Sequence, residues 1–318
     1  MKLSHSSVSL YSQCSYCYYL KYIEGIRPKK QNSALFFGKA IDDAFNILLI
    51  NKDLEKAKVH FMNAWENLRG VRMKFRKTEI DIELIDHFDT SDTRDNLEWL
   101  TLYYKGLLFI EAYYKEVLPK IKEVITVQES FSFPNIEGDE INGIIDLIVR
   151  WEDGKVYLLD NKTSSYKYGK DDARESPQLS LYHYVIGEKY KLDGIGYIVL
   201  NKNIQKNRTK ICSMCDYDGS NFRHKTCNNL VEGERCNSAW VESIHPSVEI
   251  SYIFDQIDPV IQNKVIDMFD EANTGISNEV FAKHHNPNFG KYGACDYYYY
   301  TPTNPDFYKK EKKQGSSS

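Results

Sequence analysis

The sequence predicts an α/β (α+β) protein with a central mixed β-sheet flanked by helices. Two observations carry this prediction. Apolar residues at helical spacing dominate residues 4–118, whereas β-branched runs with turn signals between them dominate residues 123–202. A helical segment at residues 176–190 separates two of these strands, so they can pair in parallel. At 318 residues, the chain is long enough to bury a large core.

Composition sets the broad class. Hydrophobic residues make up 42% of the chain and charged residues 27%, as in soluble globular proteins. The net charge of −4 does not indicate a nucleic-acid binder, but a local basic channel would be enough for one. We find no apolar run of ~20 residues and no signal-peptide core. Seven cysteines, mostly in close pairs, favour metal binding in a reducing compartment, so we expect a cytoplasmic protein without membrane contact.

The N-terminal part is predicted to be helical. Serines precede an apolar pattern at helical spacing, which predicts a capped helix over residues 4–23. Further helices are expected at residues 33–50, 53–69 and 96–118. We expect this helical region, residues 34–120, to cap one side of the sheet or to contact the substrate.

Two residue pairs in these helices have alternative interpretations. Cys14 and Cys17 lie one helical turn apart, either as small apolar core residues or as half of a metal or cluster site. Asp42 and Asp43 interrupt an apolar segment. Both can face solvent, or one can point inward, where a buried acid needs a partner or a metal.

The sheet is expected to follow. Strands are predicted from about residue 123, at residues 140–153, at 155–164 and at 192–202, with a later one near 248–255. The sequence Trp-Glu-Asp-Gly at residues 151–154 predicts a turn, so the second and third strands form an antiparallel hairpin. Pro177 suits the first turn of the helix at residues 176–190. A last helix is expected at residues 258–272.

Asp160 and Lys162 carry the predicted chemistry. Two residues apart on a strand, they point to the same face, ~6.5–7 Å apart at Cα, while Asn161 points away. Asp146 lies on the neighbouring strand and can reach the same end of the hairpin. Two carboxylates, with the backbone carbonyl of Asn161, form an oxygen-rich site for Mg²⁺ or Mn²⁺. A cation with a nearby lysine can hydrolyse a phosphodiester; the alternative is a surface Asp–Lys pair.

The order of these motifs resembles the RecB-like branch of the PD-(D/E)XK nuclease superfamily. The matching segments are G-x-I-D-L at residues 143–147, L-D-x-K-T-S at 159–164 and Q-L-x-x-Y at 178–182. The opening helix with its Cys14 and the segment F-G-K-A-I-D-D-A-F at residues 37–45 match upstream family patterns. The resemblance implies a single domain over residues 1–318 with a restriction-endonuclease-like core that cuts DNA with Mg²⁺ or Mn²⁺. It makes Asp146, Asp160 and Lys162 catalytic, with Gln178 and Tyr182 lining the site.

The chain departs from the family pattern in two places. Asp42 replaces the family's helix-borne histidine, which would harden the metal site toward Mg²⁺ or Mn²⁺ or mark a weakened site. Relatives with a [4Fe–4S] cluster use four cysteines, whereas this chain offers Cys14, Cys17 and only Cys295 late in the sequence. We therefore do not expect that cluster.

Four further cysteines predict a structural zinc site. Cys212, Cys215, Cys227 and Cys236 lie in a polar segment poor in aliphatic residues, which we expect to be a zinc-binding insertion at residues 208–241. Metal binding could supply the folding free energy that this segment lacks. His224 could replace one of the cysteines; the alternative is four unpaired thiols in a loop.

Basic residues near these sites could follow a phosphate backbone, or be solvated lysines on loops. The candidates are Lys167, Lys170, Arg174, Lys206, Arg208 and Lys210. Tyr297 to Tyr300 could stack on bases, although core or lid roles suit four consecutive tyrosines better. Residues 310–318 are expected to form a flexible tail.

The sequence thus predicts a metal-dependent DNA nuclease, most simply an exonuclease of recombination, repair or phage DNA metabolism in a bacterial cell. Partners of such an enzyme would be a single-strand-binding or annealing protein, or a helicase. The alternatives are a structure-specific endonuclease and a non-cleaving nucleic-acid-binding or assembly module with a degenerate site.

Overall fold

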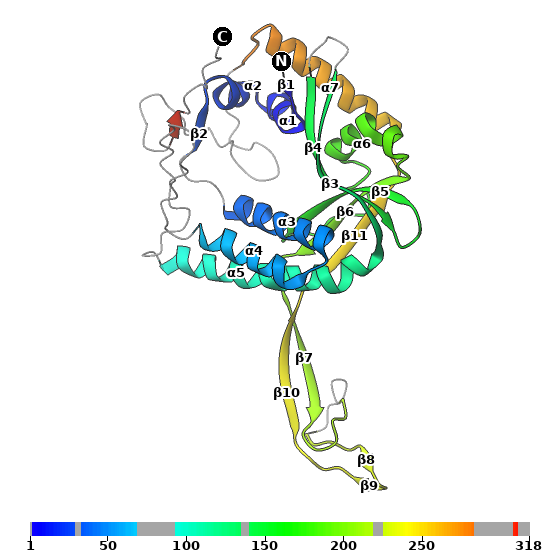
Figure 1. The fold of residues 1–318 in the computed structure, drawn as a ribbon. Coiled ribbons are helices and arrows are strands. Elements are labelled where there is room, and N and C mark those ends of the chain that lie inside the picture. The colour runs from blue at the N-terminus through cyan, green and yellow to red at the C-terminus, as the bar shows by residue number, and fades with distance from the viewer. Residues whose placement is uncertain are drawn as a thin grey trace.

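A six-stranded mixed sheet forms the centre of the computed structural model (Figure 1), which describes residues 2–28, 33–68, 93–134, 140–218, 225–282 and 308–310. Its path runs β1 (Lys2–Leu3), β4 (Glu140–Trp151), β5 (Val156–Ser164), β6 (Gly194–Asn201) and β11 (Ile250–Asp255). Strand β3 (Ile121–Pro134) pairs with β4 in addition. Neighbours are antiparallel except β1–β4 and β5–β6, which are parallel. The predicted fold class is confirmed.

The hairpin and the crossover form where the sequence predicts them. The β4–β5 turn closes when the amide of Trp151 donates to the carbonyl of Lys155 at 2.9 Å, and Gly154 adopts φ +88° there. Helix α6 (Pro177–Tyr190) then connects β5 to its parallel neighbour β6. The hydroxyl of Ser176 caps this helix by accepting from the amide of Leu179.

Three helices cover one face of the sheet. They are α3 (Ser33–Asn51), α4 (Leu54–Glu66) and α5 (Thr93–Ala112), and α5 continues as a π-helix, Tyr113–Val117, and a 3-10 turn, Leu118–Lys120. Their aromatic residues, such as Phe37 and Trp65, form one buried cluster with Leu147, Val149 and Leu159 of the sheet. The expected helical region is therefore a layer on the sheet, as Figure 1 shows.

Helices α1 (His5–Gln13), α6 and α7 (Pro259–Ser277) cover the opposite face. The single helix expected over residues 4–23 is broken: Cys14 is extended at φ −157°, and α2 (Ser15–Tyr18) and a π-helix, Tyr19–Ile23, follow it. A helix pattern alone could not show this break, because apolar spacing continues across it. Helix α7 runs five residues beyond the expected end at residue 272.

A long two-stranded ribbon projects from the body (Figure 1). Strands β7 (Gln205–Cys212) and β10 (Trp240–Ser247) pair antiparallel from Gln205–Ser247 to Cys212–Trp240. Its far end holds the small hairpin of β8 (Leu230–Val231) and β9 (Glu234–Arg235). We call residues 205–247 the arm. It is longer at both ends than the expected insertion at residues 208–241.

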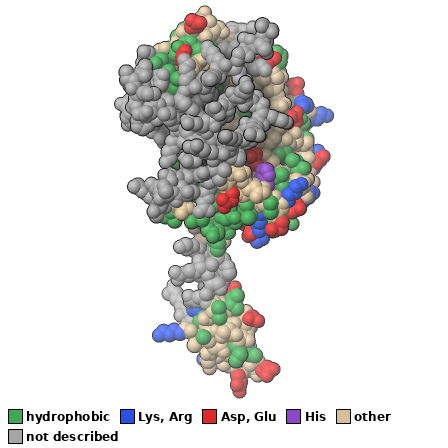
Figure 2. All heavy atoms as spheres, turned by 60° about the vertical axis from the view of Figure 1, so that its left-hand side comes forward, with side chains coloured by type: hydrophobic (Ala, Val, Ile, Leu, Met, Phe, Trp, Pro, Cys, Tyr) green, Lys and Arg blue, Asp and Glu red, His purple; other side chains and the backbone are tan. Residues whose placement is uncertain are grey.

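The tip of the arm exposes apolar and acidic side chains, visible in Figure 2. Met214 is 78% exposed and Leu230 is 65% exposed, while Glu232 and Glu234 are exposed beside them.

A segment near the N-terminus pairs with a segment near the C-terminus in a short sheet. Strand β2 (Ile26–Pro28) pairs antiparallel with β12 (Tyr308–Lys310). The flexible tail expected from residue 310 thus overlaps a strand at Lys310, and residues 311–318 lie outside the described part of the chain. Within the described residues, no helix is both long enough and apolar enough to span a membrane.

Candidate active site and cysteine cluster

Asp146 lies at a gap in the sheet. Strand β3 occupies one edge of β4 along its whole length. On the other edge, β1 pairs only with Glu140 and Ile141, and β5 pairs only from Leu147 onward. Asp146 is the last residue before the β5 pairing begins. Its side chain therefore lies beside a stretch of strand edge that neither β1 nor β5 covers.

Strand β4 also changes face at this point. Ile145 packs in the cluster of α1, α6 and α7, whereas Leu147 packs in the cluster of α3, α4 and α5. Residues two apart on a regular strand share one face, so the strand is irregular between them. The partner strand is irregular too. Val127 and Glu129 pair with Leu147 and Ile145, which places Gln128 opposite Asp146, and Gln128 has φ +53°.

Asp160 and Lys162 lie together on β5, on the face covered by α6. Asp160 is only 4% exposed, and its Oδ2 lies 2.5 Å from Nζ of Lys162. Burial by itself would lower the pKa of Lys162, but the charge and the hydrogen bond of Asp160 outweigh burial and hold that pKa above its ordinary value. The lysine therefore stays protonated at neutral pH.

Helix α3 brings Asp42 to the same place. Its Oδ2 accepts a hydrogen bond of 2.9 Å from Nε2 of Gln128, which also lies 3.4 Å from Oδ1 of Asp146. Burial and the negative charge of Asp160 raise the pKa of Asp42 to about 6. Of the two interpretations of Asp42, the structure favours the inward one.

The three carboxylates strongly repel one another. Burial, followed by the charges of Asp160 and Asp42, raises the pKa of Asp146 well above its ordinary range. One lysine cannot neutralise three acids, so the site lacks positive charge. Oxygen ligands from Asp42, Asp146 and Asp160 suit a hard divalent cation such as Mg²⁺ or Mn²⁺, which would relieve this repulsion. The donor atoms present are therefore of the type that the metal implied by the motifs prefers.

Gln178 and Tyr182 border the site from α6. Tyr182 is 8% exposed, and burial followed by the charge of Asp146 raises its pKa, while a hydrogen bond with Gln178 acts in the opposite direction. The ring of Tyr182 packs edge-to-face on Phe131 at 5.3 Å between centroids. Both rings lie over Gly143, where a Cβ would come within 2.5 Å of Phe131 and 3.1 Å of Tyr182. The glycine before Asp146 is thus required by close packing.

Asn161 points to the other face, as predicted. Its side chain lies beside Tyr113 of the π-helix, on the face covered by α3. Only its backbone carbonyl could serve the metal site.

His5 and Gln128 belong to the site but were not predicted. Their signals are weak: an isolated histidine in the first turn of a helix, and a glutamine in an alternating strand. His5 lines a cleft of about 360 Å³ together with Gln178, Tyr197 and Lys167. Burial, followed by the charge of Lys162, lowers the pKa of His5, so its imidazole is neutral at pH 7.

The predicted basic contacts are scattered. Lys167 lines the cleft, Lys170 is exposed nearby, and Arg174 is paired with Asp171 at 2.8 Å. On the arm, Nζ of Lys210 lies 5.1 Å above the ring of Trp240. Lys206 and Arg208 belong to β7, but their side chains are outside the described part.

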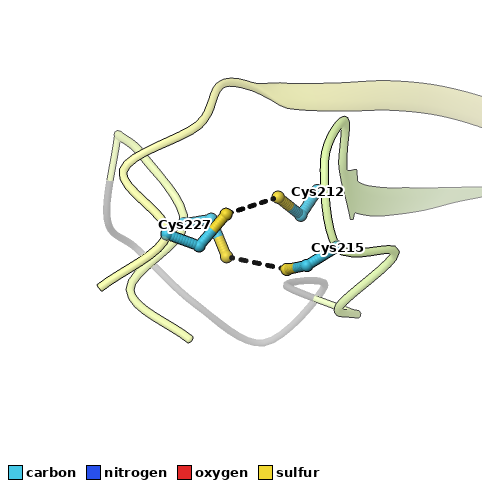
Figure 3. Close-up of side chains that lie close together, drawn as sticks. Cys212, Cys215 and Cys227 are labelled. Carbon is cyan, nitrogen blue, oxygen red and sulfur yellow. Dashed lines mark hydrogen bonds between the residues drawn. The ribbon is translucent and has the colours of Figure 1, made fainter. Parts of the chain in front are cut away.

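The four cysteines of the arm gather at its far end, and Figure 3 labels three of them, Cys212, Cys215 and Cys227. The Sγ atoms of these three and of Cys236 all lie within 4.8 Å of one another. Cys212 and Cys236 are 3.5 Å apart, and Cys215 and Cys227 are 3.7 Å apart. Tetrahedral zinc with Zn–S bonds of about 2.3 Å separates its sulfurs by about 3.8 Å. The thiol set therefore fits a zinc ion without help from His224, which lies outside the described residues.

Cys14 and Cys17 lie far from this cluster in a separate buried group. Their Sγ atoms are 2.6 Å apart, and Leu20 and Ile26 pack around them. Cys295 and Tyr297–Tyr300 lie outside the described part of the chain.

The chain was compared with known protein families, curated proteins and solved structures. The crystal structure of SSO0001 is similar at 13% identity and a TM-score of 0.26, over 57% of this chain and 66% of that chain. The match thus spans slightly less than two thirds of that protein. Comparison with curated proteins gives no significant match. The family model described as the PD-(D/E)XK nuclease superfamily matches residues 2–297, and the chain therefore belongs to that superfamily.

Proposed function

We propose that this protein is a Mg²⁺- or Mn²⁺-dependent deoxyribonuclease of the RecB-like branch. One observation carries the proposal: Asp42, Asp146 and Asp160 converge from three separate elements at the gap beside β4, next to Lys162. The order of the sequence motifs supports the RecB-like assignment.

The residues divide the work of hydrolysis. A divalent cation held by the carboxylates of Asp42, Asp146 and Asp160 would supply Lewis acidity and lower the pKa of attacking water. Lys162 remains protonated beside Asp160, so it stabilises negative charge on the phosphate and orients water rather than acting as a base. Gln178 and Tyr182 supply polar groups that position the DNA strand.

The cleft beside this centre suits a nucleotide next to the scissile phosphate. Its lining includes the cationic Lys167, the acids Asp172 and Glu175, and the rings of Tyr166 and Tyr168, and aromatic rings can stack on bases whatever the sequence. Tyr166 is 62% exposed and thus accessible to a ligand. An exonuclease that acts on strand ends in recombination, repair or phage DNA metabolism is the simplest use of such a cleft.

The test is cleavage of end-labelled linear DNA and of closed circular DNA in Mg²⁺ or Mn²⁺. We expect Asp160→Asn and Lys162→Met to lower the rate by at least about 100-fold, since each removes charge from the reacting centre. Lys155→Met, at the other end of the same hairpin, is the matched control and should cleave normally. Cleavage that survives both site substitutions would exclude this assignment.

The same assay separates the alternatives. Linear DNA cut with circular DNA intact supports an exonuclease, and nicking of the circle supports an endonuclease. A DNA band shift in EDTA, with no cleavage by the wild type in either metal, would instead identify a non-cleaving binding module.

We also propose that the four arm cysteines bind structural zinc. The purified protein should contain about one zinc per chain by elemental analysis. Cys212→Ser combined with Cys227→Ser should lose it, whereas Ser238→Ala should retain it. Ser238 is the matched control because its Oγ lies only 3.4 Å from Sγ of Cys236. Zinc that remains after both cysteine substitutions would contradict the proposal.

A further inference from the structure

Gln128 adopts a left-handed backbone conformation that residues other than glycine rarely adopt. Its φ is +53° in the middle of β3, directly opposite Asp146. Left-handed residues inside strands are strained, and such strain is maintained only where surrounding contacts hold it. The neighbouring residue supplies such contacts. Glu129 is bound by Lys189 at 2.7 Å and by the hydroxyl of Tyr190, both on α6.

The strained backbone turns the Gln128 side chain toward two acids. Its Nε2 lies 2.9 Å from Asp42 and 3.4 Å from Asp146, so a single amide links α3 to β4. A side-chain amide is well matched to this place because its two N–H groups can serve two carboxylates without adding charge. A carboxylate here would add repulsion. A lysine or arginine would compete with a divalent cation.

We propose that Gln128 is a positioning residue of the metal site, whose amide holds the carboxylates of Asp42 and Asp146 together and thereby sets the affinity for the divalent cation. This inference rests on the proposed metal-dependent function. The amide oxygen of Gln128 is also a neutral ligand of the kind that Mg²⁺ and Mn²⁺ accept. Partners that orient metal ligands typically change metal affinity by 10- to 100-fold when they are removed.

Gln128→Asn is the decisive variant. Asparagine keeps the neutral amide and tolerates the left-handed backbone at least as well as glutamine, but it is one methylene shorter. Gln128→Gly accepts the same φ without strain and removes the side chain, so neither variant can fail to fold because of the backbone. Mn²⁺ binding, followed by electron paramagnetic resonance of the free ion, gives a readout that does not depend on cleavage.

We expect both variants to bind Mn²⁺ about tenfold more weakly than the wild type, with a melting temperature in EDTA that is not lowered by more than about 2 °C. Gln128→Glu keeps the length of the side chain but cannot donate a hydrogen bond to either carboxylate, so it should melt lower in EDTA than the wild type because it adds a third charge beside Asp42 and Asp146. Mn²⁺ affinity within twofold of the wild type in both Gln128→Asn and Gln128→Gly would overturn the inference.

One control separates this inference from the proposed function. Asp160→Ala should abolish tight Mn²⁺ binding whatever residue stands at position 128. If Asp160→Ala lacks the ion while Gln128→Asn and Gln128→Gly both bind it normally, only the inference fails. If the wild type binds no Mn²⁺, or Asp160→Ala binds it normally, the metal site itself is wrong and the inference falls with it.

Discussion

Asp42 and Asp146 lie in surroundings that disfavour their charged forms. Both carboxyls are partly buried, and each lies close to other acids, while Lys162 is already paired with Asp160. Folding therefore brings like charges together at a place that only a cation or protons can neutralise. Such an unneutralised group of like charges is expected in an active site and not in a structural core.

The first prediction concerns pH in the absence of metal. The folded protein raises the pKa of Asp42 from its ordinary value of 3.8 to about 6. The folded state thus binds more protons than the unfolded state between these values, and its stability falls as the pH rises through about 6. In EDTA, we expect the free energy of unfolding to drop by on the order of 2 kcal/mol between pH 4 and pH 7 from this residue.

Urea denaturation in EDTA at several pH values measures this effect. Asp42→Asn should flatten the decline, and Mn²⁺ should offset it for the wild type at pH 7. Asp267→Asn, on the exposed side of α7, is the control and should keep the wild-type slope. A slope that is the same in Asp42→Asn and in the wild type would contradict the electrostatic account.

At the scale of the elements, strand pairing decides where the site lies. The motif residues are in β4, β5 and α6, but the space between them exists because β1 and β5 share one edge of β4 without covering it completely. Gly143 lies in this uncovered stretch and allows Phe131 and Tyr182 to pack closely. Strand irregularities at such positions are common next to active sites.

A pair of glycine substitutions tests this packing. Gly143→Ala should lower the free energy of unfolding by about 1–3 kcal/mol, because its Cβ would overlap Phe131. It should also slow cleavage, since Tyr182 must move. Gly38→Ala is the matched control: no described atom lies within 4 Å of its added Cβ, and alanine in a helix should stabilise by up to about 1 kcal/mol.

Thermal and urea denaturation of the two variants report the difference. If both alanines change stability in the same direction, the rings do not constrain residue 143 in the way that the structure shows.

At the scale of the whole molecule, the protein consists of a layered body and a projecting arm. The arm leaves the body between Asn201 and Ile250, whose strands belong to the central sheet. Gln205 already pairs with Ser247 close to the body. The cysteine cluster at the far end is therefore independent of the sheet that carries Asp146 and Asp160.

Removal of the arm should leave the body folded. We expect a variant with residues 206–246 replaced by an Asn-Gly turn to keep the melting temperature of the body and to contain no zinc. Calorimetry and elemental analysis measure the two properties. A body that no longer folds would show that the arm contributes to the core.

Much of the fold could be read from the sequence because periodicity reports which face of an element is buried. The β4–β5 hairpin, the α6 crossover and the helical layer all formed as predicted. The break at Cys14 and the arm strands β7 and β10 were not predicted. The break leaves the apolar spacing intact, and the arm sequence Gln-Lys-Asn-Arg-Thr-Lys at residues 205–210 has no apolar alternation from which a strand could be predicted.

The sequence by itself determined which functional groups are present: Asp160 and Lys162 of β5, Asp146 of β4, and four thiols at zinc-binding spacing. Only the tertiary structure decided that Asp42 points inward, and that His5 and Gln128 reach the same site. The physical reason is that a motif is local, whereas these contacts depend on how a helix lies on a sheet and on one left-handed residue in a strand. Such long-range contacts leave no spacing in the sequence from which they could be read.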